Sequence, residues 1–181
     1  MSDRANQVQS SPAPEYSVRP AQSTDIDRLV ELLLALQGHI EGSNPTLWQM
    51  TAEARANLRG QVVSRLSAEN GCAIVAAHSQ AGLVGMVFGR VVTNHRYRPS
   101  RAGLIDQLYV DPDHRRKGLG QRLVSELCRF FAGHGVDDLS LRYAVGNVEA
   151  AAFWTALGFA PRIVTAGASR QQVEATLVPD G

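Results

Sequence analysis

The sequence predicts an α/β protein, of the α+β kind, in which a mixed and mostly antiparallel sheet carries helices on both faces. Two apolar runs, Cys72–Ala77 and Leu83–Val92, flank a short polar turn and are typical of a β-hairpin. A third run of strand formers, Leu104–Val110, ends at the turn Asp111–Asp113. After this turn, apolar residues recur every four positions, which is the period of a helix. Strands and helices in this order predict the mixed sheet.

The N-terminal part is predicted to hold one strand and two helices before the hairpin. Pro20 ends the strand because it lacks an N–H donor, and Ser23 or Thr24 caps the helix that follows. Apolar residues at helical spacing carry this helix as far as Gly38. The expected segments are a strand over Tyr16–Arg19, a helix from Ser23 or Thr24 to Gly38, an irregular stretch over Gly38–Met50 and a helix over Ala52–Leu66.

Beyond the hairpin, a polar and basic connection, Thr93–Ala102, leads to the strand, turn and helix already described. That helix is predicted to end near His134 and Gly135, since glycine favours a helix end. The remaining expected elements are a strand over Leu139–Tyr143, a helix over Asn147–Leu157 and two strands after Phe159, of which Gln172–Val178 is the clearer.

Length and composition indicate an ordinary globular protein. The chain has 181 residues, of which 44% are hydrophobic and 19% charged, and its formal net charge is +1. This balance gives no reason to expect nucleic acid or a membrane as a partner, and no apolar run is long enough to span a bilayer. The polar residues 1–15, with two prolines, are expected to form a disordered lead-in, and residues 16–181 a single domain.

Two cysteines, Cys72 and Cys128, fall in a predicted strand and a predicted helix without the spacing of metal ligands. They are expected to be buried free thiols, which is consistent with a reducing cytoplasm. We therefore expect no metal site.

The turn before the long helix has the features of an anion site. From Asp113 to Arg122 it carries four cations against one carboxylate. Glycines at positions 118 and 120 let the backbone approach a bulky group, and the helix start adds unpaired N–H groups with a partial positive charge. A pyrophosphate fits this arrangement, and the alternative is a solvated basic helix start. The four cations are Arg115, Arg116, Lys117 and Arg122.

Two other phosphate motifs do not fit. A P-loop needs four residues between its glycines and a Lys-Ser/Thr pair after the second, whereas one residue separates Gly118 from Gly120 and Gln121 follows. The dinucleotide-binding fingerprint needs a third glycine where this chain has Leu123.

Two segments resemble the motifs of the GNAT acetyltransferases. The first is similar to the Q/R-x-x-G-x-G/A signature of that family with its preceding strand, and the second to its N-x-x-A-x-x-F-Y-x-x-L-G-F block. The motifs have the order and about the spacing seen in the family, and the resemblance is firm over Leu83–Phe159. The matching residues are Val110, Asp111, Pro112 and Arg115 to Gly120 in the first motif, and Asn147, Ala150, Phe153, Trp154, Leu157, Gly158 and Phe159 in the second.

This resemblance implies a site for acetyl-CoA between two strands, Leu104–Val110 and Leu139–Tyr143, that splay apart at one end. The pantetheine would pair with the backbone of Leu108 and Val110, and the pyrophosphate would bind the amides of Arg115 to Gly120. Asn147 would contact the cofactor arm, and a helix N-cap is its compatible alternative. The implied cofactor-binding residues are Leu108, Tyr109, Val110, Arg115, Arg116, Lys117, Gly118, Leu119, Gly120, Asn147, Phe153 and Trp154.

The implied reaction is transfer of the acetyl group to an amine, which must first lose a proton because its pKa is about 10. Asp106 is the candidate base, acting through a water, and a structural aspartate at a strand bulge is the alternative. Trp154 departs from the family, which commonly has a tyrosine there to protonate the leaving thiolate; an indole N–H cannot do so. Tyr109 and Tyr143 are candidate substitutes, and packing is the alternative for both.

The main interpretation is an N-acetyltransferase for a small-molecule amine. A peptide or protein N-acetyltransferase and a non-catalytic acyl-CoA-binding module are the alternatives, and a homodimer is compatible with the sequence. The residues expected on the acceptor side are His39, Glu41, Trp48, His95 and Tyr97.

Overall fold

The computed structural model of the protein describes residues 15–43, 48–96 and 98–177. The chain divides into two compact units, Met1–Ala144 and Val145–Gly181, and each is described by itself. Of the expected N-terminal lead-in, residues 1–14 lie outside the described residues.

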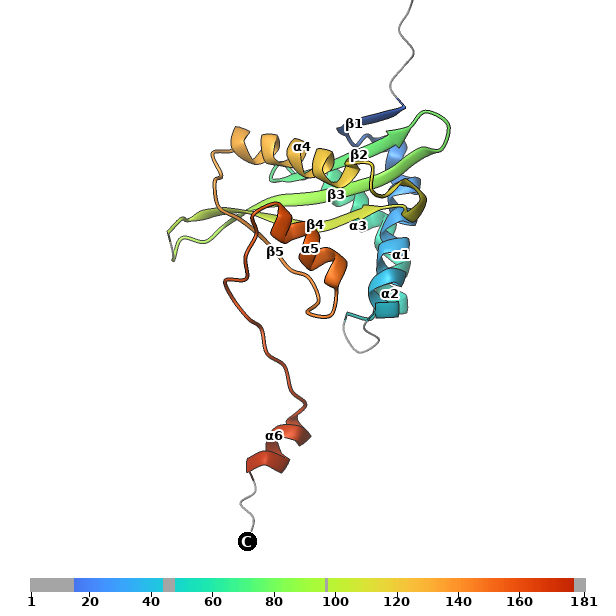
Figure 1. The fold of residues 1–181 in the computed structure, drawn as a ribbon. Coiled ribbons are helices and arrows are strands. Elements are labelled where there is room, and N and C mark those ends of the chain that lie inside the picture. Colours follow the sequence, from blue (N-terminus) through green and yellow to red (C-terminus); the bar gives the residue numbers. More distant parts are fainter. Residues whose placement is uncertain (1–14, 44–47, 97, 178–181) are drawn as a thin grey trace, which may run out of the picture. The chain divides into compact units, whose positions relative to one another are not determined.

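The first unit is built on a five-stranded sheet in the order β1-β2-β3-β4-β5 (Figure 1). Neighbouring strands from β1 to β4 are antiparallel, and β5 is parallel to β4, so the predicted mixed and mostly antiparallel sheet is confirmed. The strands are β1 (Tyr16–Pro20), β2 (Gly71–His78), β3 (Gly82–Thr93), β4 (Arg101–Val110) and β5 (Leu139–Leu141).

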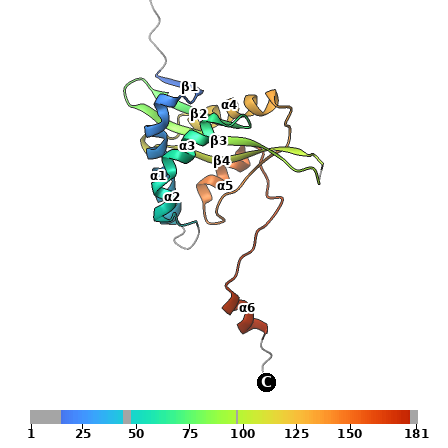
Figure 2. The same cartoon turned by 180° about the vertical axis from the view of Figure 1, so that it is seen from behind.

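Helices cover both faces of this sheet (Figure 2). On one face, α1 and α3 pack their leucines and valines against a cluster that includes Met86, Phe88 and Tyr109. On the other face lies α4, whose buried Leu123, Leu127 and Phe131 follow the predicted four-residue period. The helices of this unit are α1 (Ile26–Ser43), α2 (Ala52–Ala56), α3 (Leu58–Ser67) and α4 (Leu119–Gly133), with short 3-10 turns at Ser23–Asp25 and Pro112–His114.

The first helix differs from its prediction at both ends. Neither Ser23 nor Thr24 caps it; instead the buried Asp25 accepts a hydrogen bond from the Gln22 amide and pairs with Arg19. The helix also continues past Gly38 to Ser43. A glycine costs a helix only about 1 kcal/mol, and the hydrogen bond from Gln37 Nε2 to Glu41 Oε1 spans it.

The second predicted helix of this unit is divided. It forms α2 and α3, which separate at Asn57. Both cysteines, Cys72 and Cys128, are free thiols as predicted, and both are partly buried. Burial raises the pKa of Cys72 to about 11 and also raises that of Cys128.

The second unit begins with α5 (Val148–Ala156), whose N-cap is Asn147, as predicted. The two strands predicted after Phe159 are wrong for the described residues: residues 160–169 carry no regular element, and Arg170–Leu177 forms a helix, α6. A strand needs a neighbour for its backbone and side chains, whereas residues 160–177 are exposed and an Arg170–Glu174 pair one turn apart favours the helix. Val178 lies outside the described residues.

In the described part of the chain, no helix combines the length and the hydropathy that crossing a membrane requires.

Candidate functional site

The C-terminal half of β4 has one edge that β5 does not cover. The parallel pairing joins only Gly103–Ile105 of β4 to Leu139–Leu141 of β5, so β5 leaves β4 at Asp106. In an antiparallel pair, opposite residues alternate between exchanging hydrogen bonds and facing outward. The Asp111 amide donates to Val84 O at 2.8 Å, which places Leu108 and Val110 among the residues whose N–H and C=O groups point away from β3. These backbone groups therefore face the uncovered edge, as the predicted splay of the two strands requires.

The turn that follows β4 is shaped by two left-handed residues. Arg116 has φ +63° and Gly118 has φ +72°. Left-handed residues in a tight turn direct neighbouring N–H groups into a concavity that suits an anion. Gly118 is also the N-cap of α4, whose first turn contains no acidic residue, so the positive end of the helix is not neutralised locally.

The four cations of this turn are not equivalent. Arg115 donates from Nε to Val110 O at 3.0 Å and lies 5.9 Å from the centre of the Tyr109 ring. Lys117 and Arg122 both bind Tyr16 of β1, through its hydroxyl at 2.8 Å and its carbonyl at 3.2 Å. Of these four cations, Arg116 alone makes no hydrogen bond or ion pair with the described residues, and it is exposed. Its guanidinium is therefore the one most available to a phosphate.

Tyr16 is a site residue that the sequence did not indicate. Its hydroxyl lies 3.0 Å from His114 Nδ1 and accepts a hydrogen bond from Lys117 Nζ, which raises the pKa of Lys117. Its ring lies 4.9 Å from that of His78 and 5.8 Å from that of His114. Tyr16 of β1 thus holds two of the four cations in place, Lys117 through its hydroxyl and Arg122 through its carbonyl.

We expect Tyr16→Phe to weaken acetyl-CoA binding about fivefold without changing kcat, because one hydrogen bond to Lys117 is worth about 1 kcal/mol. Phenylalanine keeps the ring that packs on His78 and His114. Steady-state kinetics with varied acetyl-CoA would measure the effect. An unchanged KM for acetyl-CoA would show that Tyr16 does not position Lys117 for the ligand.

Arg28 of α1 also supports the turn that follows β4. It donates from Nε to Leu83 O at 3.0 Å and from Nη2 to Asp111 Oδ2 at 2.8 Å. Because Asp111 directly precedes the Pro112–His114 turn, this ion pair ties α1 to the end of β4. Arg28 and Asp111 are 83 positions apart in the sequence, and no local sequence pattern predicts their contact.

Asp106 lies where the uncovered edge begins. The β3–β4 register passes from Phe88–Gln107 to Gly89–Ile105, so Asp106 is the extra residue of a β-bulge. Its Oδ2 accepts a hydrogen bond from Arg90 Nε at 3.1 Å and lies 3.9 Å from Arg65 Nη2, and the side chain is 14% exposed. The bulge position and the two arginine partners fit a structural role for Asp106. Its location where β5 leaves β4 fits a catalytic role.

The two candidate proton donors, Tyr109 and Tyr143, differ in their surroundings, and so does Trp154, which stands where the family commonly has a tyrosine. Tyr109 is buried in the α1 cluster, and burial is the main reason that its pKa is raised. Tyr143 follows β5 by two residues, is partly buried, and its hydroxyl makes no hydrogen bond with the described residues. In the second unit, Trp154 is buried, with Phe153 and Phe159 edge-on at 4.9 and 5.3 Å. Of the two tyrosines, Tyr143 is the less buried.

Asn147, the other second-unit candidate, uses its side-chain oxygen to accept a hydrogen bond from the Ala150 amide at 2.9 Å. This confirms the N-cap interpretation. Cofactor contacts by Asn147, Phe153 and Trp154 stay predictions.

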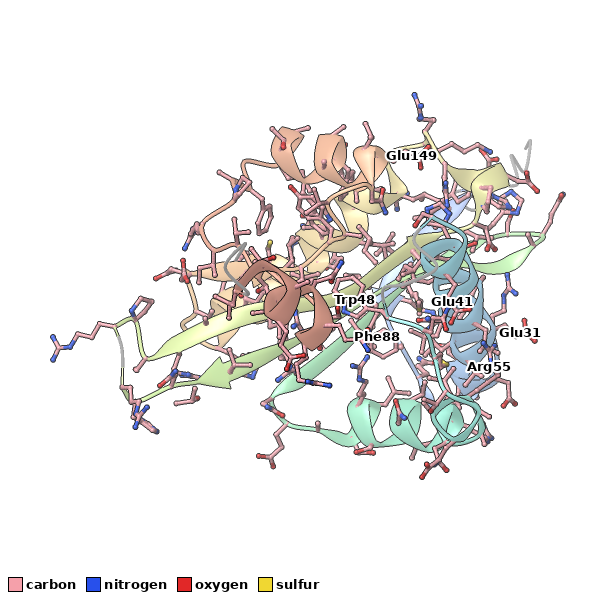
Figure 3. The ribbon with its side chains drawn as sticks, turned by 90° about the horizontal axis from the view of Figure 1, so that it is seen from below. Glu31, Glu41, Trp48, Arg55, Phe88 and Glu149 are labelled. Carbon is pink, nitrogen blue, oxygen red and sulfur yellow. The ribbon has the colours of Figure 1, made fainter. Side chains whose placement is uncertain are left out.

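The expected acceptor residues separate into two groups. His39 and Glu41 lie on the C-terminal part of α1, and Trp48 lies in the segment that leads to α2 (Figure 3). His95 lies at the tip of the β3–β4 hairpin, and Tyr97 is outside the described residues. The hairpin tip adjoins the end of β4 that β5 covers, so the structure does not bring His95 to the uncovered edge.

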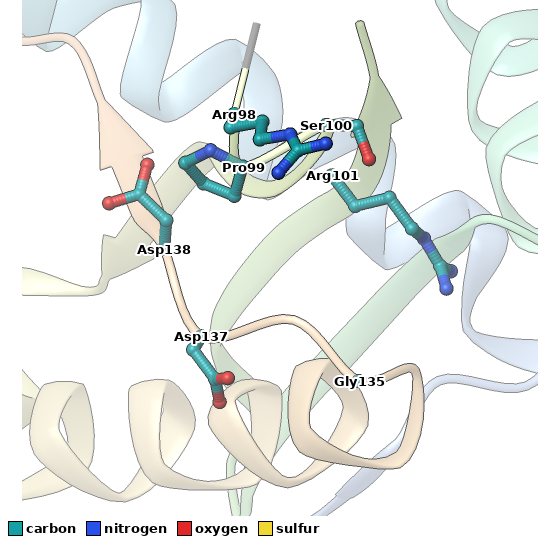
Figure 4. Close-up of a pocket in the computed structure, with 7 residues that line it drawn as sticks. All are labelled: Arg98, Pro99, Ser100, Arg101, Gly135, Asp137 and Asp138. Atoms are coloured by element: carbon teal, nitrogen blue, oxygen red, sulfur yellow. The ribbon is translucent and has the colours of Figure 1, made fainter. Parts of the chain in front are cut away.

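A hollow of about 590 Å³ also lies at this far end, between the hairpin tip and the loop after α4 (Figure 4). β4 has ten residues, and at about 3.3 Å per residue the hollow is roughly 30 Å from the turn that follows Val110. It is therefore separate from the cationic turn at residues 115–120. Its lining residues are Arg98, Pro99, Ser100, Arg101, Gly135, Asp137 and Asp138.

The uncovered edge of β4 is followed by the cationic N-terminus of α4. In an α/β protein this arrangement suits an extended ligand that carries phosphate groups. Residues 35–159 match the model of the acetyltransferase (GNAT) family. The chain therefore belongs to this family, whose members are acyl-CoA-dependent acetyltransferases.

Solved structures share the fold at low sequence identity. A tetramutant of the BH1408 protein from Bacillus halodurans has a TM-score of 0.74 and 17% identity, with 84% of this chain and 99% of that chain covered. The GCN5-related N-acetyltransferase from Ralstonia eutropha has a TM-score of 0.69 and 20% identity, covering 85% and 98%. An aminoglycoside 6'-N-acetyltransferase from Acinetobacter haemolyticus has a TM-score of 0.66 and 18% identity, covering 85% and 97%.

Among curated proteins, human N-acetyltransferase 8 is 31% identical over 91 residues. This match spans 50% of the present chain and 40% of the human protein. The chain thus matches less than half the length of that relative.

Proposed function

We propose that this protein transfers the acetyl group of acetyl-CoA to a primary amine of a small molecule. The observation that carries the proposal is the continuous path from the uncovered edge of β4, at Leu108 and Val110, into the N-terminus of α4. Two free thiols are consistent with action in a reducing cytoplasm.

The residues present fit acetyl-CoA as a substrate. The outward N–H and C=O groups of Leu108 and the outward N–H of Val110 suit the amides of a pantetheine arm, which would add to β4 as another strand does. The Val110 carbonyl already accepts a hydrogen bond from Arg115. The amides from Arg115 to Gly120 suit the pyrophosphate. At Gly118, where φ is positive, even a Cβ would meet no other atom within 4 Å, so the surface there is open to a ligand.

Each chemical task has a candidate in the first unit. Asp106 would take the proton of the acceptor amine through a water. The outward amide of Leu108 or Val110 would donate to the oxyanion that forms at the acetyl carbonyl. The Tyr143 phenol would protonate the departing thiolate.

Release of the CoA thiol, measured with a panel of amines, tests the function. The panel runs from polyamines and aminoglycosides to peptide N-termini. Turnover with small amines is the expected result, and turnover with peptides alone would favour the peptide or protein N-acetyltransferase. Binding of acetyl-CoA without turnover of any amine would identify a non-catalytic module.

Replacing Asp106 by asparagine tests the proposed base. We expect turnover to fall about tenfold at pH 7 and much less at pH 9.5, because an amine with a pKa near 10 supplies far more of its free base at the higher pH. The measurement is the pH profile of kcat for both proteins.

A structural role for Asp106 would give a different profile. Loss of the Arg90 pair would then lower the melting temperature and reduce kcat equally at all pH values. Arg90→Met, which breaks the same pair and leaves the carboxylate, is the matched control.

A further inference from the structure

Trp48 is an exposed indole on an unusual backbone. It is 47% exposed, and its φ of +57° lies in the left-handed region that bulky residues rarely adopt. Its ring makes no aromatic contact and its N–H no hydrogen bond with the described residues. Strained residues of this kind persist where the surrounding contacts hold them, and they concentrate at binding sites.

The contacts that hold Trp48 are to the main chain. Gln37 Nε2 donates to Trp48 O at 2.6 Å, and the Met50 amide donates to Glu41 Oε1 at 2.9 Å. The same Glu41 oxygen accepts from Gln37 Nε2 at 2.7 Å. Because these hydrogen bonds use only the main chain, they would form with any side chain at position 48. The local structure therefore does not explain why this residue is a tryptophan.

Glu41 supplies a negative charge beside this segment. Hydrogen bonds from the Met50 amide and from Gln37, with a smaller contribution from the charge of Arg55, lower the pKa of Glu41. Both hydrogen bonds use Oε1, and Oε2 makes none with the described residues. Glu41 and Arg55 form no ion pair within 4 Å, so one carboxylate oxygen is available to a ligand.

Glu41 lies on the same helix as a residue that packs on the core next to β4. Leu36 of α1 packs against the cluster that contains Tyr109, which sits between Leu108 and Val110. Glu41 follows Leu36 by five residues, or about 7.5 Å along the helix axis. The spacing between the two amines of the acceptor is therefore the variable to test.

We propose that Trp48 and Glu41 form a cation subsite, and that the acceptor is a diamine or polyamine whose second ammonium group binds there. An ammonium over an indole face gains a cation–π interaction, and a carboxylate beside it adds charge attraction. The inference rests on the proposed function and names the class of its acceptor.

The test compares each α,ω-diamine of three to eight carbons with the monoamine of the same length, at saturating acetyl-CoA. We expect the KM of the best diamine to be about tenfold below that of its matched monoamine. Glu41→Gln keeps an oxygen for the Met50 and Gln37 hydrogen bonds and removes only the charge. Trp48→Leu removes only the indole. Each variant is expected to abolish most of the diamine advantage, so that the KM values of the diamine and the matched monoamine converge.

Equal KM values for diamine and monoamine in the original protein would overturn the inference, as would a diamine advantage that survives in both variants. Calorimetry of 1,5-diaminopentane and of 1-aminopentane, with CoA present, gives a readout that needs no turnover. Preferential diamine binding that depends on Glu41 would support the subsite even if no amine on the panel were acetylated. In that outcome the proposed function would fail, and the subsite would stand.

Discussion

Replacing Gly118 by glutamate is expected to weaken acetyl-CoA binding more than 100-fold, because like charges brought together in a binding site cost several kcal/mol. The carboxylate would lie at the N-terminus of α4, where we propose that the pyrophosphate binds. Apart from its own chain neighbours, no atom lies within 4 Å of a Cβ built at position 118, so there is room for the new side chain. The new side chain therefore has no steric clash with the protein, and the loss of affinity should come from repulsion of the ligand's charge.

Gly118→Gln is the matched control for this result. It carries the same bulk and the same cost of a positive φ, which is about 1–2 kcal/mol for a residue other than glycine, but no charge. Calorimetry on both variants, after circular dichroism has shown them folded, separates charge from size. A folded glutamate variant with unchanged affinity would refute the proposed pyrophosphate site.

The parts of the site that the sequence predicted are the local ones. The cationic turn is formed by Arg115 to Gly120, which are neighbours in the chain, and the buried face of α4 depends on a four-residue period. The hairpin β2–β3 likewise needs only two apolar runs and a turn. Each of these features depends on residues that lie close together in the sequence.

The parts that the sequence missed depend on distant partners. Lys117 is held by Tyr16, 101 positions away, and Asp106 meets arginines from α3 and β3. The strand predicted over Gln172–Val178 is wrong for a related reason. Apolar and polar residues alternate in this segment as in a strand, but a strand forms only beside another strand. In the described residues that segment is exposed, so its local helix propensity decides its form.

The second large effect is expected at Tyr143. Changing Tyr143 to phenylalanine should lower kcat about 100-fold, which is the usual contribution of a positioned acid. Tyr143 follows the part of β5 that pairs with β4. Its hydroxyl makes no hydrogen bond with the described residues. Affinity for acetyl-CoA should stay unchanged, because the ring is kept and only the proton donor is lost. Single-turnover kinetics would measure the chemical step directly.

Trp154→Tyr tells whether the acid role lies at Tyr143 or is vacant. If Tyr143 supplies the proton, a new phenol at position 154 should change kcat little, since Trp154 is buried with Phe153 and Phe159 against its ring. If kcat rises with tyrosine at position 154 and is insensitive to Tyr143→Phe, the role is vacant in this protein. A thiol with a pKa near 8.5 is a tolerable leaving group without help, so a rate insensitive to both changes would mean that water protonates the thiolate. A loss confined to Tyr143→Phe is the result that assigns the acid.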